Sequence, residues 1–308
     1  MTAAAAATAP DHDPRDIIPR DLRFDIPGNA TRRWFADDLV KTATIDGLSI
    51  FLPDGERFFI RALKHYANKL DDKTLAKEIN GYAVQEAFHT REHESYNKAM
   101  ASLGYPVERM EKIVGKALGI PMRPIDRLAV TCAIEHLTAT FSTATLRYDE
   151  MLEGAHPAYR RLWTWHALEE LEHKAVALDV LAAATHDMSG FKRYWLRIAM
   201  MNATVIPFLI IFLRNVRLYV RADGEKTGPR FWWRFLKVMF GRPGYLRLSV
   251  GPFLSYYKPG FDPKNVDDSE LVAKGRAWLA TNMPESTKTG RKPPKAGPAG
   301  GPPLPVAG

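Results

Sequence analysis

The chain has 308 residues, of which 46% are apolar, so it can bury a sizeable hydrophobic core in one domain or more. Its single cysteine, Cys132, excludes an intramolecular disulfide and suits a reducing cytoplasm. The formal charge of +8 favours an anionic partner, but no nucleic-acid-binding motif accompanies it, so we expect no nucleic-acid partner.

The two ends of the chain are predicted to lack stable structure. Residues 1–30 are expected to form a flexible arm, because their alanine-rich start has neither the basic region nor the apolar run of a secretory signal. Residues 284–308 are rich in proline, glycine and lysine. They cannot bury enough apolar surface to fold, so a disordered tail is expected there.

Four long helices are predicted between these ends. Helical periodicity covers residues 31–68, with an interruption at Pro53 where a helix can restart. Further helices are expected over 73–103, 124–153 and 157–185, and Gly104 and Gly154 are suitable stops. No alternating strand pattern competes. The sequence therefore predicts an all-α protein with a four-helix bundle over residues 31–190.

The predicted helices carry a repeated pattern of acidic and imidazole side chains. In chain order it is Glu, Glu-x-x-His, Glu, Glu-x-x-His, formed by Glu56, Glu86, His89, Glu135, Glu170 and His173. Residues three apart on a helix share one face, so each Glu-x-x-His can direct two ligands to one centre. Helical bundles hold a pair of iron or manganese ions with this ligand set. The pattern therefore predicts a dinuclear metal centre.

Other histidines are assigned by their spacing from this pattern. His166 lies four residues before Glu170, on the same face, and is predicted to be a seventh ligand. His93 lies four after His89 and competes for that role, although support of the centre or a place in the substrate pocket is preferred. His136 is not assigned to the centre, because neighbouring helical residues point about 100° apart.

The residues around the ligands are expected to orient them. Such partners fix the ring of a ligand histidine and tune the metal. Four candidates for an extra ligand or a supporting contact are Gln85, Glu169, Asp179 and Tyr82. No catalytic residue is predicted beyond the metal ligands.

The chemical types of the predicted ligands limit which metal the centre can hold. Mixed carboxylate and imidazole ligands without a thiolate suit iron or manganese, and zinc is compatible. Two iron ions are therefore expected, with manganese, a mixed manganese–iron pair and zinc as alternatives.

Residues 191–265 are expected to form an apolar and basic helical extension that packs on the bundle. The apolar run 198–213 is too short to span a bilayer unaided, since a spanning helix needs about 20 apolar residues. Residues 230–240 combine aromatic and basic side chains, which is typical of an interfacial helix. Packing alone is the simpler interpretation, and contact with an anionic membrane surface is the alternative.

Several segments resemble a bacterial family named "predicted metal-dependent hydrolase". The resemblance spans about residues 15–265 and is carried by segments 51–59, 85–89, 134–139, 165–177 and 257–261. The ligand pattern also resembles that of ferritin-like di-iron oxygenases, including arylamine N-oxygenases, whose third histidine matches His166. This resemblance implies a ferritin-like bundle with additional C-terminal helices. The sequence departs from the family at Asp262, where a histidine is expected.

The function expected from these observations is a di-iron oxidoreductase. It would use O₂ or peroxide to oxidise a small organic, apolar substrate, with electrons from a donor protein or reductant. The alternatives are a binuclear metal-dependent hydrolase, a ferroxidase, and a non-enzymatic membrane-associated metal protein. A cytoplasmic location is expected, with attachment to the inner membrane if the basic segment binds lipid. The oligomeric state is left open, a homo-oligomer included.

Overall fold

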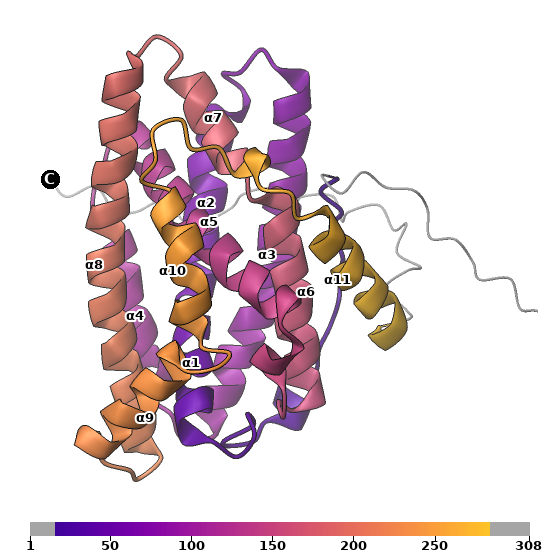
Figure 1. The fold of residues 1–308 in the computed structure, drawn as a ribbon, viewed down its shortest axis with the longest axis vertical. Coiled ribbons are helices and arrows are strands. Elements are labelled where there is room, and N and C mark those ends of the chain that lie inside the picture. Colours follow the sequence, from indigo (N-terminus) through magenta and orange to yellow (C-terminus); the bar gives the residue numbers. More distant parts are fainter. Residues whose placement is uncertain (1–15, 284–308) are drawn as a thin grey trace, which may run out of the picture.

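The structure is a computed structural model that describes residues 16–283, and its regular elements are helices (Figure 1). Within that range the only β-type pairing is an isolated bridge between Phe35 and Ala155. The predicted all-α class is confirmed, while the ferritin-like character of the bundle stays a prediction. The predictions for residues 1–15 and for the tail 284–308 lie outside the described residues.

The centre of the fold is a bundle of long helices. It contains α2 (Leu52–Ala67), α3 (Lys73–Ser102), α5 (Pro124–Arg147) and α6 (Pro157–His173). Helix α2 packs against α3 and α5, and α6 packs against α5 and α3. The four helices that carry the candidate ligands therefore enclose a common interior.

The first predicted helix is divided as its proline suggests. Helix α1 (Leu39–Ser49) starts at Asp38, whose carboxylate accepts hydrogen bonds from the backbone N–H groups of Val40 and Lys41 at 2.7 and 3.2 Å. Helix α2 then begins with Pro53 in its first turn, where the missing N–H has no intrahelical partner to lose. The predicted restart is confirmed, and it sets Glu56 in the first turns of a new helix.

The predicted helices over 124–153 and 157–185 are longer than the helices in the structure. Helix α5 ends at Arg147 and a 3₁₀ turn, η2 (Asp149–Leu152), follows. The predicted helix over 157–185 is two helices, α6 and α7 (Val176–Ala184), separated by Lys174 and Ala175. Lys174 pairs with Asp268 at this break. Helix α6 therefore ends at His173, its last candidate ligand.

The N-terminal segment is packed, which corrects the prediction of a flexible arm for residues 16–30. Burial alternates along this extended stretch: Arg20, Leu22, Phe24 and Ile26 are buried, while the residues between them are exposed. A short 3₁₀ turn, η1 (Pro27–Asn29), ends it. An extended segment points alternate side chains to opposite sides, so half of them can pack on the bundle.

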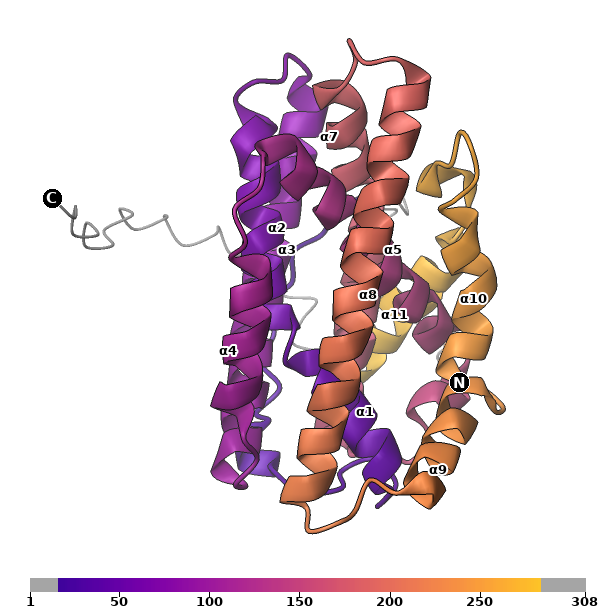
Figure 2. The same cartoon turned by 90° about the vertical axis from the view of Figure 1, so that its left-hand side faces the viewer.

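Further helices cover the bundle (Figure 2). They are α4 (Val107–Leu118), α8 (Gly190–Ala222), α9 (Pro229–Phe240), α10 (Tyr245–Ser255) and α11 (Ser269–Asn282), with a 3₁₀ turn η3 (Pro263–Asn265). Helix α8 lies on α1 and α5, α10 on α5 and α9, and α11 on α6. The segment 191–265 packs on the bundle, whereas α4 and α11 were not anticipated.

Helix α8 is longer than its apolar sequence run. It has 33 residues with Pro207 inside, and its most apolar window has a mean hydropathy of 2.0 with 22% of that window buried. By length and composition it can cross a membrane, which corrects the estimate that this segment is too short. These two properties alone do not place it in one, because helices of soluble proteins share them.

Candidate metal centre

The bundle helices direct all seven predicted ligands into one interior region. They come from α2 (Glu56), α3 (Glu86 and His89), α5 (Glu135) and α6 (His166, Glu170 and His173). None of these side chains is more than 4% exposed. Four acidic side chains are thus buried together, which is unfavourable unless cations or protons compensate their charge.

His173 contacts two carboxylates in a first group of ligand atoms. Its Nε2 lies 3.0 Å from Glu86 Oε1, and its Nδ1 lies 3.2 Å from Glu135 Oε2. One ligand atom each from Glu86, His89, Glu170 and His173 lie within 4.8 Å of one another. This group therefore offers two carboxylates and two imidazoles to a single ion.

A second group lies beside the first. One ligand atom each from Glu56, His93 and His166 lie within 4.8 Å of one another. His166 Nε2 is 3.1 Å from Glu170 Oε1, so Glu170 connects the two groups. His93 Nε2 is 3.1 Å from His166 Nδ1, so His93 reaches the centre directly. The pattern of the sequence thus converges in two adjacent groups.

The contacts of His89 indicate which nitrogen faces the centre. Its Nε2 lies 3.2 Å from Glu169 Oε2, and its Nδ1 lies 4.0 and 3.9 Å from oxygens of Glu86 and Glu170. Nε2 thus faces the Glu169 carboxylate, and Nδ1 is the nitrogen on the side of the two ligand carboxylates. Carboxylate partners fix ligand imidazoles in this way. Glu169 is therefore placed where the sequence predicted a supporting residue.

Burial controls the protonation of the centre. It raises the pKa of Glu86 to about 8, an effect that contact with His173 partly offsets. It raises the pKa of Glu56 well above its ordinary range, and the nearby Glu86 charge adds to the increase. Burial also lowers the pKa of His89 far below its ordinary value, with the neighbouring His166 contributing. His89 is therefore held as the neutral imidazole, the form that binds metals.

Two members of the centre are held in their charged forms by each other. Burial would lower the pKa of His173, but the charges of Glu135 and Glu170 raise it well above the ordinary value. Burial would raise the pKa of Glu170, but His173 and the hydrogen bond from His166 bring it below the ordinary value. A proton on His173 thus balances part of the carboxylate charge, as a bound metal cation would.

The unsatisfied oxygens of the centre fit a metal. Within residues 16–283, neither carboxylate oxygen of Glu56 has a hydrogen-bond partner, and Glu170 Oε2 also lacks one. Buried polar groups are nearly always paired in folded proteins. Carboxylate oxygens and imidazole nitrogens are the donors that iron, manganese and zinc accept. The residues present therefore suit one or two such ions.

A buried ionic network that the sequence did not reveal supports this centre. The Arg20 guanidinium donates to Glu169 Oε1 at 3.1 Å and to Glu172 Oε1 at 2.7 Å. Through Glu169 this network reaches His89. Arg20 could not be identified in advance, because its partners lie about 150 residues away in sequence. Ser49, whose hydroxyl is 3.0 Å from His93 Nδ1, was missed for the same reason.

The remaining supporting residues divide into one that contacts a ligand and two that do not. The Tyr82 hydroxyl donates to Glu135, as its position one turn before Glu86 suggested. Gln85 instead donates to Glu172 at 2.9 Å. Asp179 accepts from Lys264 at 2.6 Å near the surface, so its expected contact with a ligand histidine is wrong. Gln85 and Asp179 lie on helix faces that point away from the ligands.

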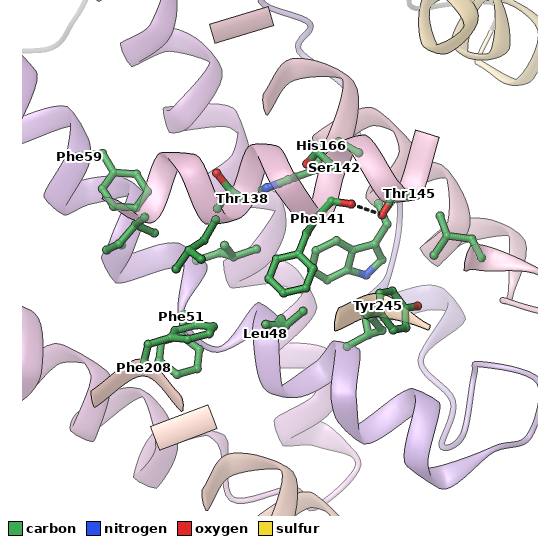
Figure 3. A pocket seen from close by; sticks show the side chains of 18 of the residues that line it. Leu48, Phe51, Phe59, Thr138, Phe141, Ser142, Thr145, His166, Phe208 and Tyr245 are labelled. Carbon is green, nitrogen blue, oxygen red and sulfur yellow. Dashed lines mark hydrogen bonds between the residues drawn. The ribbon is translucent and has the colours of Figure 1, made fainter. Parts of the chain in front are cut away.

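An apolar pocket adjoins the centre at His166 (Figure 3). Its empty volume is about 1000 Å³, open solvent at its mouth included. His166 and Thr138 lie along one side, and Phe51 and Phe208 along the other. No Asp, Glu, Lys or Arg is among its described lining residues. The Thr138 hydroxyl donates to the backbone carbonyl of Glu135, so its proton is not available to a ligand. Because the lining is otherwise mostly hydrocarbon and aromatic, the pocket suits an apolar molecule.

Comparison with known proteins gives one match. A family model described as "Predicted metal-dependent hydrolase" matches residues 18–267. No curated protein and no solved structure matches. The matched range contains both groups of ligand atoms and the residues that line the pocket.

Proposed function

The chain belongs to the predicted metal-dependent hydrolase family, and from this we propose that it is an enzyme with a dinuclear metal centre acting on a small apolar substrate. One observation carries the proposal: two adjacent groups of buried Glu and His ligand atoms lie beside an apolar pocket, which His166 lines. A structural role alone does not explain this burial, because buried carboxylates without a cation destabilise a fold.

The residues of the chain would prepare the site in three ways. Glu169 keeps His89 Nδ1 directed at the centre, and the Tyr82 hydroxyl holds Glu135. The apolar walls exclude water and orient a substrate by shape. His166, the one described pocket residue among the predicted ligands, marks where a substrate meets the centre. Bound metal ions would supply Lewis-acid activation of water or, if iron, electrons for O₂.

The description of the family favours hydrolysis of an ester or amide as the reaction to test first. A specific observation favours oxidation as the second candidate. The described pocket lining contains no charged side chain that could bind a polar group or act as a separate general base. An apolar pocket beside a carboxylate-rich centre is compatible with oxidation of an apolar substrate by O₂, with two iron ions as the proposed cofactor and an external electron donor.

Metal analysis and two activity assays test these proposals together. Protein purified without oxygen from cells supplied with iron, manganese and zinc is expected to contain about two ions per chain. The reduced protein is then exposed to O₂ while its visible absorption is recorded, and separate samples are incubated with aryl esters of increasing chain length. Metal-dependent ester cleavage without O₂ consumption assigns the hydrolase. Oxygen uptake with a transient absorption band assigns the oxidase, and protein that binds no metal refutes both.

A further inference from the structure

Helix α8 presents an apolar face to solvent. Ile206, Leu209, Ile210 and Leu213 are 60%, 42%, 65% and 38% exposed. Their spacing of three and four residues puts them on one side of the helix. A continuous exposed apolar stripe of this kind usually marks an interaction surface rather than chance exposure.

The neighbouring helices continue this surface. Trp233 and Phe240 of α9 are 61% and 50% exposed, and Leu254 of α10 is 54% exposed. Helices α9 and α10 pack against each other, and α8 lies on the adjacent side of the molecule, with α9 near its C-terminal end (Figures 1 and 2). We call the exposed side of α8, α9 and α10 the outer face. Tryptophan and phenylalanine mixed with basic residues are typical of membrane interfaces.

The charges around the outer face are of one sign. The segment 214–258 holds ten basic residues and two acids. They are Arg214, Arg217, Arg221, Lys226, Arg230, Arg234, Lys237, Arg242, Arg247 and Lys258.

Both acids of that segment already pair with arginines that precede α1. Asp223 accepts from Arg32 at 2.9 Å and from Arg33 at 2.8 Å, and Glu225 lies 3.7 Å from Arg33. Of the ten basic residues, Arg234 pairs with Asp38 at 3.1 Å, and within residues 16–283 the other nine form no ion pair. Most of the positive charge of the outer face is therefore uncompensated, and an anionic surface would complement it.

We propose that the outer face docks on an anionic lipid surface with α8 lying along it. A symmetric contact with a second copy would bring the same positive charges together, which is unfavourable. The opposite side of α8 packs on α1 and α5 and buries Arg197 and Asn215. A helix held to the bundle along its length lies on a membrane rather than across it.

This orientation places the pocket beside the lipid. Phe208 lines the pocket and its ring centroid is 4.8 Å from that of Phe51. Ile206 and Ile210 are its neighbours on the exposed side of the same turn. A lipid-derived substrate could then enter past Phe208; this extension rests on the proposed function, whereas the docking itself does not.

Co-sedimentation of the full chain with vesicles tests the docking. Vesicles of equal parts phosphatidylglycerol and phosphatidylcholine are compared with pure phosphatidylcholine at low and high salt. The wild type is expected to sediment with the anionic vesicles at low salt and to be released at high salt, because the Debye length shortens. Absence of sedimentation at low salt overturns the proposal.

Charge reversal gives the decisive comparison. The test variant is Arg217→Glu, Arg230→Glu and Lys237→Glu combined; these side chains are exposed. At about 1 kcal/mol for each basic residue near the surface, loss of three should weaken binding about a hundredfold. The control makes the same charge change on α3, on the other side of the bundle, at Lys73, Lys77 and Lys98.

The apolar part of the face has its own variant, Ile206→Ser with Ile210→Ser. Its binding to anionic vesicles is expected to fall at least about tenfold, because two isoleucines no longer enter the lipid. Equal losses in the test and control charge variants would overturn the proposal. So would a double serine variant that binds vesicles normally but loses a dimer in analytical ultracentrifugation, since a second copy would then cover the face. Metal content, measured in every variant, reports separately on the proposed centre.

Discussion

Replacing Glu56 by glutamine separates a metal-binding role of this side chain from a structural one. Glutamine has nearly the same shape but no charge. Within residues 16–283 no well-formed hydrogen bond reaches the carboxylate of Glu56, and glutamine can keep its contact with the Thr90 hydroxyl. Burial already raises its pKa well above the ordinary range, so the metal-free fold gains little from the ionised form. We therefore expect metal-free Glu56→Gln protein to be about as stable as the metal-free wild type.

Metal should reveal the difference. A ligand present at a hundred times its dissociation constant stabilises the folded state by about 2.7 kcal/mol. At about 2.1 cal/mol/K of unfolding entropy per residue, a chain of 308 residues gains roughly 1.5 °C in melting temperature for each kcal/mol, which gives roughly 4 °C for the wild type. Glu56→Gln should lose at least half of that increase, because the second group of ligand atoms loses its only carboxylate.

Glu172→Gln is the matched control. Glu172 is also buried, but it accepts hydrogen bonds from Arg20 at 2.7 Å, Gln85 at 2.9 Å and Arg276 at 3.0 Å. Breaking a buried ion pair from one side destabilises a protein by roughly 3–5 kcal/mol. This variant should therefore be destabilised without metal, yet still gain stability when metal is added.

Thermal unfolding of chelator-treated protein, with and without ferrous or manganous ion under anaerobic conditions, measures both quantities. Elemental analysis of the same samples gives the bound metal. The reasoning is refuted if metal-free Glu56→Gln is destabilised as strongly as Glu172→Gln, or if it binds and responds to metal as the wild type does.

Two further predictions concern the centre and the surrounding core. Glu86→Ala or Glu170→Ala should lower metal content far more than His136→Ala, because the His136 ring contacts the Pro252 carbonyl at 3.1 Å instead of the ligands; equal losses in elemental analysis would contradict this. Burial raises the pKa of Asp46 from 3.8 to about 7. Ionising Asp46 therefore destabilises the fold: the penalty is absent below the unfolded pKa and complete above the folded one. Asp46→Asn should reduce the fall in unfolding free energy between acidic and mildly alkaline pH, and an unchanged fall in denaturant titrations would rule out Asp46 as its source.

The pattern of the ligands could be predicted because it is local. Glu86 and His89, or His166, Glu170 and His173, share a helix face by spacing alone. The structure gathers these residues in two groups, although their binding of metal stays a prediction. The helix restart at Pro53 was also predictable, because proline acts on its own backbone.

The tertiary structure decided everything that depends on distant parts of the chain. Arg20 lies in a segment whose composition indicated a flexible arm, yet it is buried between Glu169 and Glu172. His93 was one of two histidines at equivalent spacing, and only the approach of α1 and α6 brings it between Ser49 and His166. The apolar pocket likewise needs α1, α2, α4, α5, α6, α8 and α10 together. Helical periodicity records which side of a helix is buried, whereas the partner that buries it is set by the packing of the whole chain.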